Sequence, residues 1–240
     1  MDIWQVSLAA LAVFSGALIQ SGIGFGYALV VAPVLMLLNP DWVPAPVIMS
    51  ALFLTSLVAG REWREIQWRL VGRILLGFLP GLAVGAWLLA GASSRQMAVI
   101  FGVLTLGAVA MSALGLQPAL RLRNVLLAGV CSGVMNVTTS MGGPPLAIVL
   151  QSLPGAALRG TLAATFGING SLSLLTLVVV GRFGGEALQV GVLSLPFVLL
   201  GFLASRGLSR WLDRGRVRAA VLTLAGGAGV FVLLRGVMGW

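Results

Sequence analysis

Apolar residues recur along the chain in long blocks, and the charged residues lie in the short loops between the blocks or near the block ends. The blocks cover residues of about 3–38, 43–60, 69–91, 95–115, 124–151, 156–181, 187–209 and 216–239. A helix needs about 20 apolar residues to cross a bilayer, and no gap between blocks is long enough for a soluble domain. The pattern therefore predicts an all-α membrane protein of about eight apolar blocks, organised as one transmembrane domain over residues 1–240.

Two of these blocks, the first and the fifth, are interrupted by glycine. The first contains Gly22, Gly24 and Gly26, and the fifth contains a run from Gly142 to Pro145. The first is also too long for one span, and the fifth is long and irregular. Each block could therefore be a single long helix or a hairpin of two helices.

The arginines in the loops distinguish these alternatives, because cytoplasmic loops of membrane proteins carry an excess of basic residues. If every block crosses once, the 15 arginines divide eight to seven between the two sides. If both glycine-broken blocks are hairpins, 12 arginines fall on one side and only Arg95, Arg182 and Arg235 on the other. We therefore predict two hairpins, cytoplasmic arginine-rich loops, and both termini on the periplasmic side of a bacterial inner membrane.

The composition is typical of a protein embedded in a lipid bilayer. The chain is 59% hydrophobic and 9% charged, with a mean hydropathy of +1.06, which a soluble surface cannot accommodate. The net charge of +9 is explained by the loop arginines and anionic membrane lipid, so no nucleic acid partner is expected. One cysteine, Cys131, excludes an internal disulfide and leaves too few thiolates for a metal site. No metal or other cofactor is expected.

The two halves of the chain resemble one another. Three sets of residues match at offsets of 116 to 121 positions: Ser15, Gly16 and Gly26 with Ser132, Gly133 and Gly143; Gly60 and Arg61 with Gly181 and Arg182; and Leu79, Pro80 and Gly85 with Leu195, Pro196 and Gly201. These matches predict internal repeats over about 3–115 and 121–239. Each repeat would contain five segments, and because five is odd, the second copy would enter the membrane from the opposite side. Chance similarity between glycine- and leucine-rich helices is the alternative explanation.

The glycine breaks are the candidate binding site. Non-helical backbone at membrane depth is tolerated where it is buried or lines a cavity, and inverted-repeat transporters bind substrate near the midplane at broken helices. Two helix N-termini meeting there would suit a small anion. The candidate substrate-binding residues are Gln20, Ser21, Gly22, Gly24 and Gly26 in the first break; Asn136, Thr138, Thr139, Ser140, Gly142, Gly143 and Pro144 in the second; and Asn169 in a later span.

Close helix packing is the competing explanation for small residues in membrane spans. We prefer it for Gly77, Gly81 and Gly85, which follow small-xxx-small spacing. It also remains open for the glycines of the two breaks. Asn169, with Ser171 and Ser173, could either face a cavity or cap a kink.

Acidic residues are absent from the apolar blocks. All six lie in loops or near chain ends: Asp2, Asp41, Glu62, Glu65, Glu186 and Asp213. The chain has no histidine. The usual intramembrane proton relay and the usual catalytic acids and bases are therefore missing, and an enzyme is not expected.

The duplicated glycine-rich segment resembles the signature of the sulfite exporter TauE/SafE family. The segment runs from Ser15-Gly16 through Gly22-Ile23-Gly24-Phe25-Gly26 to Pro33, and again from Ser132-Gly133 through Met141-Gly142-Gly143-Pro144-Pro145 to Leu146. The usual glycine triplet is replaced in part by Phe25 and Met141. The resemblance extends over nearly the whole chain and implicates Gly22, Gly24, Gly26, Gly142, Gly143 and Pro144.

The resemblance implies a bacterial integral membrane protein that moves sulfur-containing organic or inorganic anions. Together with the predicted site, it favours an exporter of sulfite, organosulfonates or related sulfur-containing or carboxylate anions, working by alternating access between two repeats. A membrane binding or assembly partner without transport activity is the alternative. Coupling, transport direction and oligomeric state are left open by the sequence.

Overall fold

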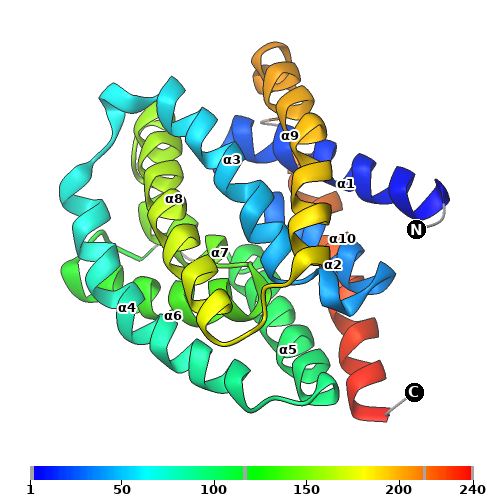
Figure 1. Cartoon of the computed structure of the whole chain (residues 1–240). Helices are drawn as coiled ribbons and strands as arrows, with labels where there is room; N and C mark the ends of the chain where they lie inside the picture. Colours follow the sequence, from blue (N-terminus) through cyan, green and yellow to red (C-terminus); the bar gives the residue numbers. More distant parts are fainter. Residues whose placement is uncertain (1–2, 116–117, 213–214, 239–240) are drawn as a thin grey trace.

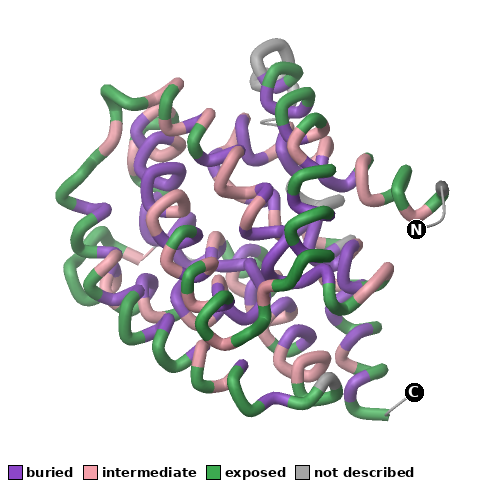
Figure 2. The backbone as a smooth tube through the Cα atoms, viewed as in Figure 1, coloured by how far each residue is buried: buried purple, intermediate pink, exposed green. Residues whose placement is uncertain are grey.

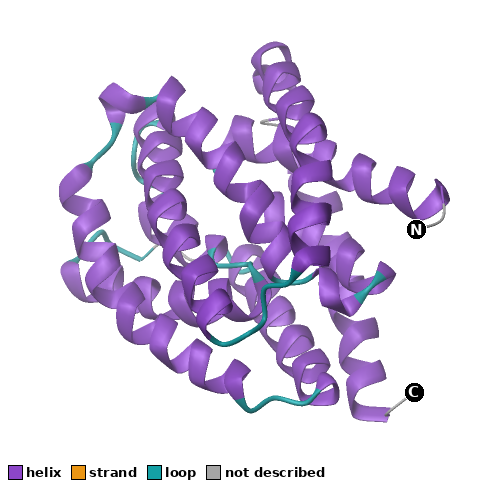
Figure 3. Ribbon diagram, viewed as in Figure 1, coloured by secondary structure: helices purple, strands orange, loops and turns teal. Residues whose placement is uncertain are grey.

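The computed structural model describes residues 3–115, 118–212 and 215–238, which form helices joined by short loops (Figure 3). No strand occurs among them. The prediction of an all-α membrane protein is therefore confirmed. The chain ends, which we predict to be periplasmic, lie outside the described residues. The side chains of residues 206–221, which include several of the predicted cytoplasmic arginines, are also outside the described part of the structure.

The described residues form ten α-helices and two short 3-10 helices (Figure 1). The first half comprises α1 (Ile3–Ile23), α2 (Tyr27–Leu38), η1 (Pro40–Trp42), α3 (Ala45–Arg61), η2 (Trp63–Glu65), α4 (Trp68–Ala90) and α5 (Ser94–Ala113). The second half comprises α6 (Leu122–Thr139), α7 (Gly143–Leu150), α8 (Gly155–Val179), α9 (Gly185–Leu212) and α10 (Gly215–Met238).

Among the described residues, six helical segments are long and apolar enough to cross a membrane. They cover residues 4–23, 40–61, 68–90, 95–113, 155–179 and 185–205. Large apolar side chains such as Trp87, Val179 and Leu193 are exposed on the outer faces of these helices, while buried positions concentrate in the interior (Figure 2). An outer surface of this kind is stable in lipid rather than in water. The chain is thus a multi-pass membrane protein.

Both glycine-broken blocks fold as pairs of helices. The break between α1 and α2 contains two glycines with left-handed backbone, Gly24 at φ 104° and Gly26 at φ 116°. The break between α6 and α7 follows Ser140, at φ 60°. Helices α2 and α7 are only about 18 Å and 12 Å long, too short for a hydrocarbon core of about 30 Å. In each pair, the short helix packs back against its long partner.

Glycines allow several of the long helices to approach closely. A Cβ placed on Gly77 would lie 2.2 Å from the carbonyl oxygen of Leu126, and one on Gly81 would lie 2.1 Å from that of Val130. Helices α4 and α6 therefore run side by side in the same direction, with backbone against backbone. The packing role predicted for Gly77, Gly81 and Gly85 is confirmed. Helices α1 and α9 make the same kind of contact at Gly201, where a Cβ would lie 2.4 Å from the Phe14 carbonyl oxygen.

Polar contacts define two ends of the bundle. At one end, Glu62 lies between Arg61 and Arg159, with closest N···O distances of 3.2 and 3.0 Å. We call this the arginine-rich end. At the opposite end, Arg95 Nε donates to the Gly236 carbonyl (2.9 Å) and Arg182 Nη2 to the Ala92 carbonyl (2.8 Å). Arg95 and Arg182 therefore lie together, away from Arg61 and Arg159, as the predicted division of loop arginines requires.

Candidate functional site

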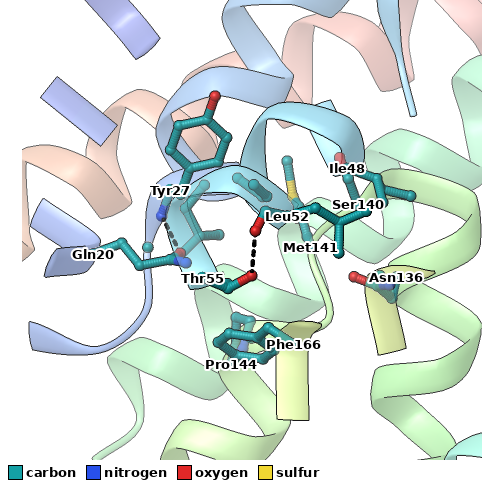
Figure 4. Close-up of a pocket in the computed structure, with 16 residues that line it drawn as sticks. Gln20, Tyr27, Ile48, Leu52, Thr55, Asn136, Ser140, Met141, Pro144 and Phe166 are labelled. Atoms are coloured by element: carbon teal, nitrogen blue, oxygen red, sulfur yellow. Dashed lines mark hydrogen bonds between the residues drawn. The ribbon is translucent and has the colours of Figure 1, made fainter. Parts of the chain in front are cut away.

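The two helix breaks meet at a cavity within the bundle, which we call the central cavity. A Cβ on Gly143, at the start of α7, would lie 3.6 Å from Phe25 Cβ in the other break and 3.6 Å from Phe166 Cζ of α8. The central cavity measures about 40 Å³ (Figure 4). Its lining comes from both breaks and from α3 and α8: Gln20, Gly26, Tyr27, Ala28, Leu29, Ile48, Ala51, Leu52, Thr55, Asn136, Ser140, Met141, Gly143, Pro144, Phe166 and Gly170.

Gln20 holds the first break in shape. Its Oε1 accepts a hydrogen bond of 3.1 Å from the Tyr27 N–H at the start of α2, and its own carbonyl accepts one of 2.7 Å from Gly24 N–H. Figure 4 shows the Gln20 side chain reaching Tyr27 along the edge of the cavity. Because the carboxamide oxygen is fixed by a backbone donor, the orientation of the amide is set, and the two N–H groups on Nε2 remain available.

The first turn of α2 supplies further donors. Ala28 and Leu29 line the central cavity, and within the described chain neither backbone N–H has a hydrogen-bond partner. The first four N–H groups of a helix have no partner inside the helix, so these two point out of its N-terminal end. Gly143 is placed similarly at the start of α7, whereas Pro144 and Pro145 have no N–H to offer. The cavity thus collects hydrogen-bond donors from both hairpins.

The second break is held by hydroxyl groups and by close packing. Thr139 Oγ1 donates to the Met135 carbonyl (2.7 Å) and accepts from Met141 N–H (3.3 Å), which ends α6. A Cβ on Gly142 would lie 2.8 Å from Ser132 Oγ, so a side chain does not fit there. The polar run at the end of α6 therefore serves mostly to shape the turn.

Asn136 connects the second break to α8. Its Nδ2 donates to Ser173 Oγ over 2.9 Å, across the gap between α6 and α8. Asn169, one turn before Ser173, is 1% exposed, and neither atom of its amide has a partner within the described residues. Unpaired buried amides are costly, so this cluster beside the cavity is a polar site without its full complement of hydrogen bonds.

The predicted site residues divide into two groups. Those that line the central cavity are Gln20, Gly26, Asn136, Ser140, Gly143 and Pro144. Those that do not are Ser21, Gly22, Gly24, Thr138, Thr139, Gly142 and Asn169.

Several residues of the second group make contacts elsewhere. The Ser21 carbonyl accepts a hydrogen bond of 2.6 Å from Arg61 Nη2. A Cβ on Gly24 would lie 3.3 Å from Arg159 Cα. Thr138 lines a separate cavity of about 100 Å³ with Arg182.

Sequence reasoning missed several lining residues. Thr55 and Phe166 come from α3 and α8, where no motif marks them. Tyr27 could have been found, because it directly follows Gly26 and begins α2. Its hydroxyl donates to Ser50 Oγ over 2.7 Å, which ties the first break to α3.

The described residues around the central cavity carry no formal charge. None of its lining residues is an aspartate, glutamate or arginine. No group of His, Cys, Asp or Glu able to hold a metal ion occurs in the described part of the chain. An anion in the cavity would therefore be held by amide donors and helix dipoles, as in other helix-terminus anion sites.

Broken helices that meet at a cavity inside a multi-pass helical bundle are the architecture of a membrane transport protein. The family model for the sulfite exporter TauE/SafE matches residues 8–232, and the chain belongs to this family. Its members are transporters rather than enzymes.

A similar protein is the "Probable sulfite/organosulfonate exporter TauE" of Cupriavidus necator. The alignment spans 240 positions with 23% identity, and it covers 94% of this chain and 93% of the relative. No solved structure matches the chain. The resemblance seen in the glycine-rich segments thus extends to a full-length relative.

Proposed function

We propose that the protein exports small sulfur-containing or carboxylate anions, such as sulfite and organosulfonates, through the central cavity. The observation that supports this most is the set of donors without partners around one uncharged space: Gln20 Nε2 and the N–H groups of Ala28, Leu29 and Gly143. No acidic side chain opposes them in the lining. Converging amide donors at helix N-termini favour an oxyanion over a cation.

The size of the central cavity also supports a small ligand. A cavity needs about 10–15 Å³ to hold one water molecule, so 40 Å³ holds about three. That is the space needed by the head of a small oxyanion. A large hydrophobic or polymeric substrate does not fit.

We further propose that the single domain 1–240 consists of two inverted repeats, about 3–115 and 121–239. Helix pairing supports this: α1 packs on α9 as α6 packs on α4, and α2 packs on α10 as α7 packs on α5. Each first helix therefore contacts the fourth helix of the other half. Rocking of the halves about the central cavity would give alternating access.

In this proposal the arginine-rich end faces the cytoplasm and both termini are periplasmic, in a bacterial inner membrane. The contacts of Arg61 and Arg159 at one end, and of Arg95 and Arg182 at the other, support this orientation. A membrane partner without transport activity has less support, because such a protein needs no cavity between the two breaks.

The test is counterflow in proteoliposomes with labelled sulfite, methanesulfonate and acetate, and with a labelled organic cation as the control. We expect uptake of at least one anion and none of the cation. Liposomes preloaded with a non-transported anion give the background rate. Absence of anion counterflow by folded protein would overturn the proposal.

A further inference from the structure

A second, larger cavity adjoins the central one. It measures about 230 Å³ and lies toward the arginine-rich end, where it reaches Leu158 at the start of α8. Gly26 and Leu29 line both cavities, so the two spaces are neighbours across the first turn of α2. Gly26 presents no side chain at this junction. A Cβ placed there would meet one atom within 4 Å, Ile19 Cγ2 at 3.2 Å.

The chemistry of the second cavity differs from that of the first. Its walls are formed mainly by aliphatic and aromatic side chains, including Ile23, Phe25 and Ile148, and its polar groups are Ser112 and Gln151. None of the lining residues that the structure describes is charged. A space of this composition favours apolar groups, since burial of each CH2 stabilises a complex by about 0.8 kcal/mol.

Size separates the two spaces further. The central cavity has room for about three waters, which an oxyanion head fills, so any organic substituent on the anion must lie outside it. The larger cavity adjoins it, and its 230 Å³ is enough for a short alkyl chain.

We infer that the larger cavity is a tail subsite, which takes the short, uncharged, apolar substituent of an organosulfonate whose head lies in the central cavity. This inference rests on the proposed function, because it assigns the head group to the anion site. The substrate class would accordingly be amphiphilic anions with a compact head and a short apolar chain. Sulfite would use the head site alone.

The test measures inhibition of labelled sulfite counterflow by unlabelled alkanesulfonates with one to five carbons. In the wild type, we expect the half-inhibitory concentration to fall by up to about fourfold per methylene. In Ala147→Phe, which fills the larger cavity, the gain with chain length should disappear while inhibition by unlabelled sulfite stays unchanged. Ala110→Phe, an exposed position on α5, is the matched control and should behave as the wild type.

Thermal stabilisation of the purified protein by the same series provides a second measurement that does not require transport. Leu158→Trp, which fills the larger cavity from the start of α8, is a second variant in case Ala147→Phe does not fold. Inhibition and stabilisation that do not improve with chain length, or a gain that survives both cavity-filling variants, would overturn the tail subsite. If the wild type shows no sulfite counterflow but is still stabilised by the longer sulfonates, the proposed function would be overturned instead.

Discussion

At the residue scale, the side chain that decides most about the central cavity is Gln20. It is 7% exposed, and its side-chain oxygen Oε1 is fixed by Tyr27 N–H at 3.1 Å, so only the N–H donors of its amide remain available. A carboxamide in this position favours anions without adding a formal charge. That suits a transporter, because a fixed positive charge would bind the substrate too tightly for release.

Changing the charge of Gln20 while keeping its shape tests this role. Gln20→Glu places a like charge beside the anion, which costs several kcal/mol, so we expect KM for sulfite to rise roughly a hundredfold. Gln20→Met removes the donors without adding charge, and we expect a rise of about fivefold, from the loss of about 1 kcal/mol. The measurement is the concentration dependence of counterflow.

Gln67→Glu is the matched control, because Gln67 is exposed in the loop before α4. It should leave KM unchanged. Equal KM values for Gln20→Glu and the wild type would mean that the anion does not contact Gln20.

At the scale of the helices, hydrophobic blocks and loop arginines were sufficient to predict the all-helical fold and the two broken blocks. Glycine spacing also predicted that Gly77, Gly81 and Gly85 serve close packing. It did not identify α6 as the partner, where Gly81 lies against the Val130 backbone. The contributions of Thr55 and Phe166 could not be predicted. They depend on how α3 and α8 rotate against the breaks, which is decided by tertiary packing rather than by local pattern.

The predicted polar run at the end of α6 shows a related limit. Sequence marks Thr138, Thr139 and Ser140 as equally polar, yet only Ser140 lines the central cavity. Thr139 hydrogen bonds to the Met135 carbonyl instead, as threonines in membrane helices commonly do. Whether a hydroxyl faces a cavity or its own helix follows from the backbone at the break, where Ser140 adopts a left-handed conformation.

At the scale of the whole molecule, polar contacts connect the two halves at both ends of the bundle. At the arginine-rich end, Glu62 of the first half pairs with Arg159 of the second at 3.0 Å. At the opposite end, Trp42 Nε1 donates to Glu186 Oε1 over 2.8 Å, and Arg182 binds the Ala92 carbonyl. If the halves rock against each other, each set of contacts must open in turn.

Removing one set should shift this balance. Glu62→Gln weakens the pair at the arginine-rich end by on the order of 1 kcal/mol, so we expect that end to open about fivefold more often. Single cysteines at Leu158 and at Val43, in a Cys131→Ser background, report the arginine-rich and opposite ends through their reaction rates with a hydrophilic thiol reagent. The rate at Leu158→Cys should rise and that at Val43→Cys should fall.

Glu65→Gln, which changes an exposed glutamate of η2, serves as the control for this experiment and should alter neither rate. Parallel changes at both reporter positions would argue against alternating opening of the two ends.

In the proposed transport path the anion passes between the two helix breaks, and sulfite counterflow by Gly143→Leu tests this path. A leucine there must occupy the space between Phe25 and Phe166, whose nearest atoms lie 3.6 Å from the Cβ position. Gly72→Leu is the matched control, because a Cβ on Gly72 meets nothing within 4 Å. We expect Gly143→Leu to abolish counterflow at normal protein levels and Gly72→Leu to retain it. Full counterflow by folded Gly143→Leu would mean that the anion does not pass between the two breaks.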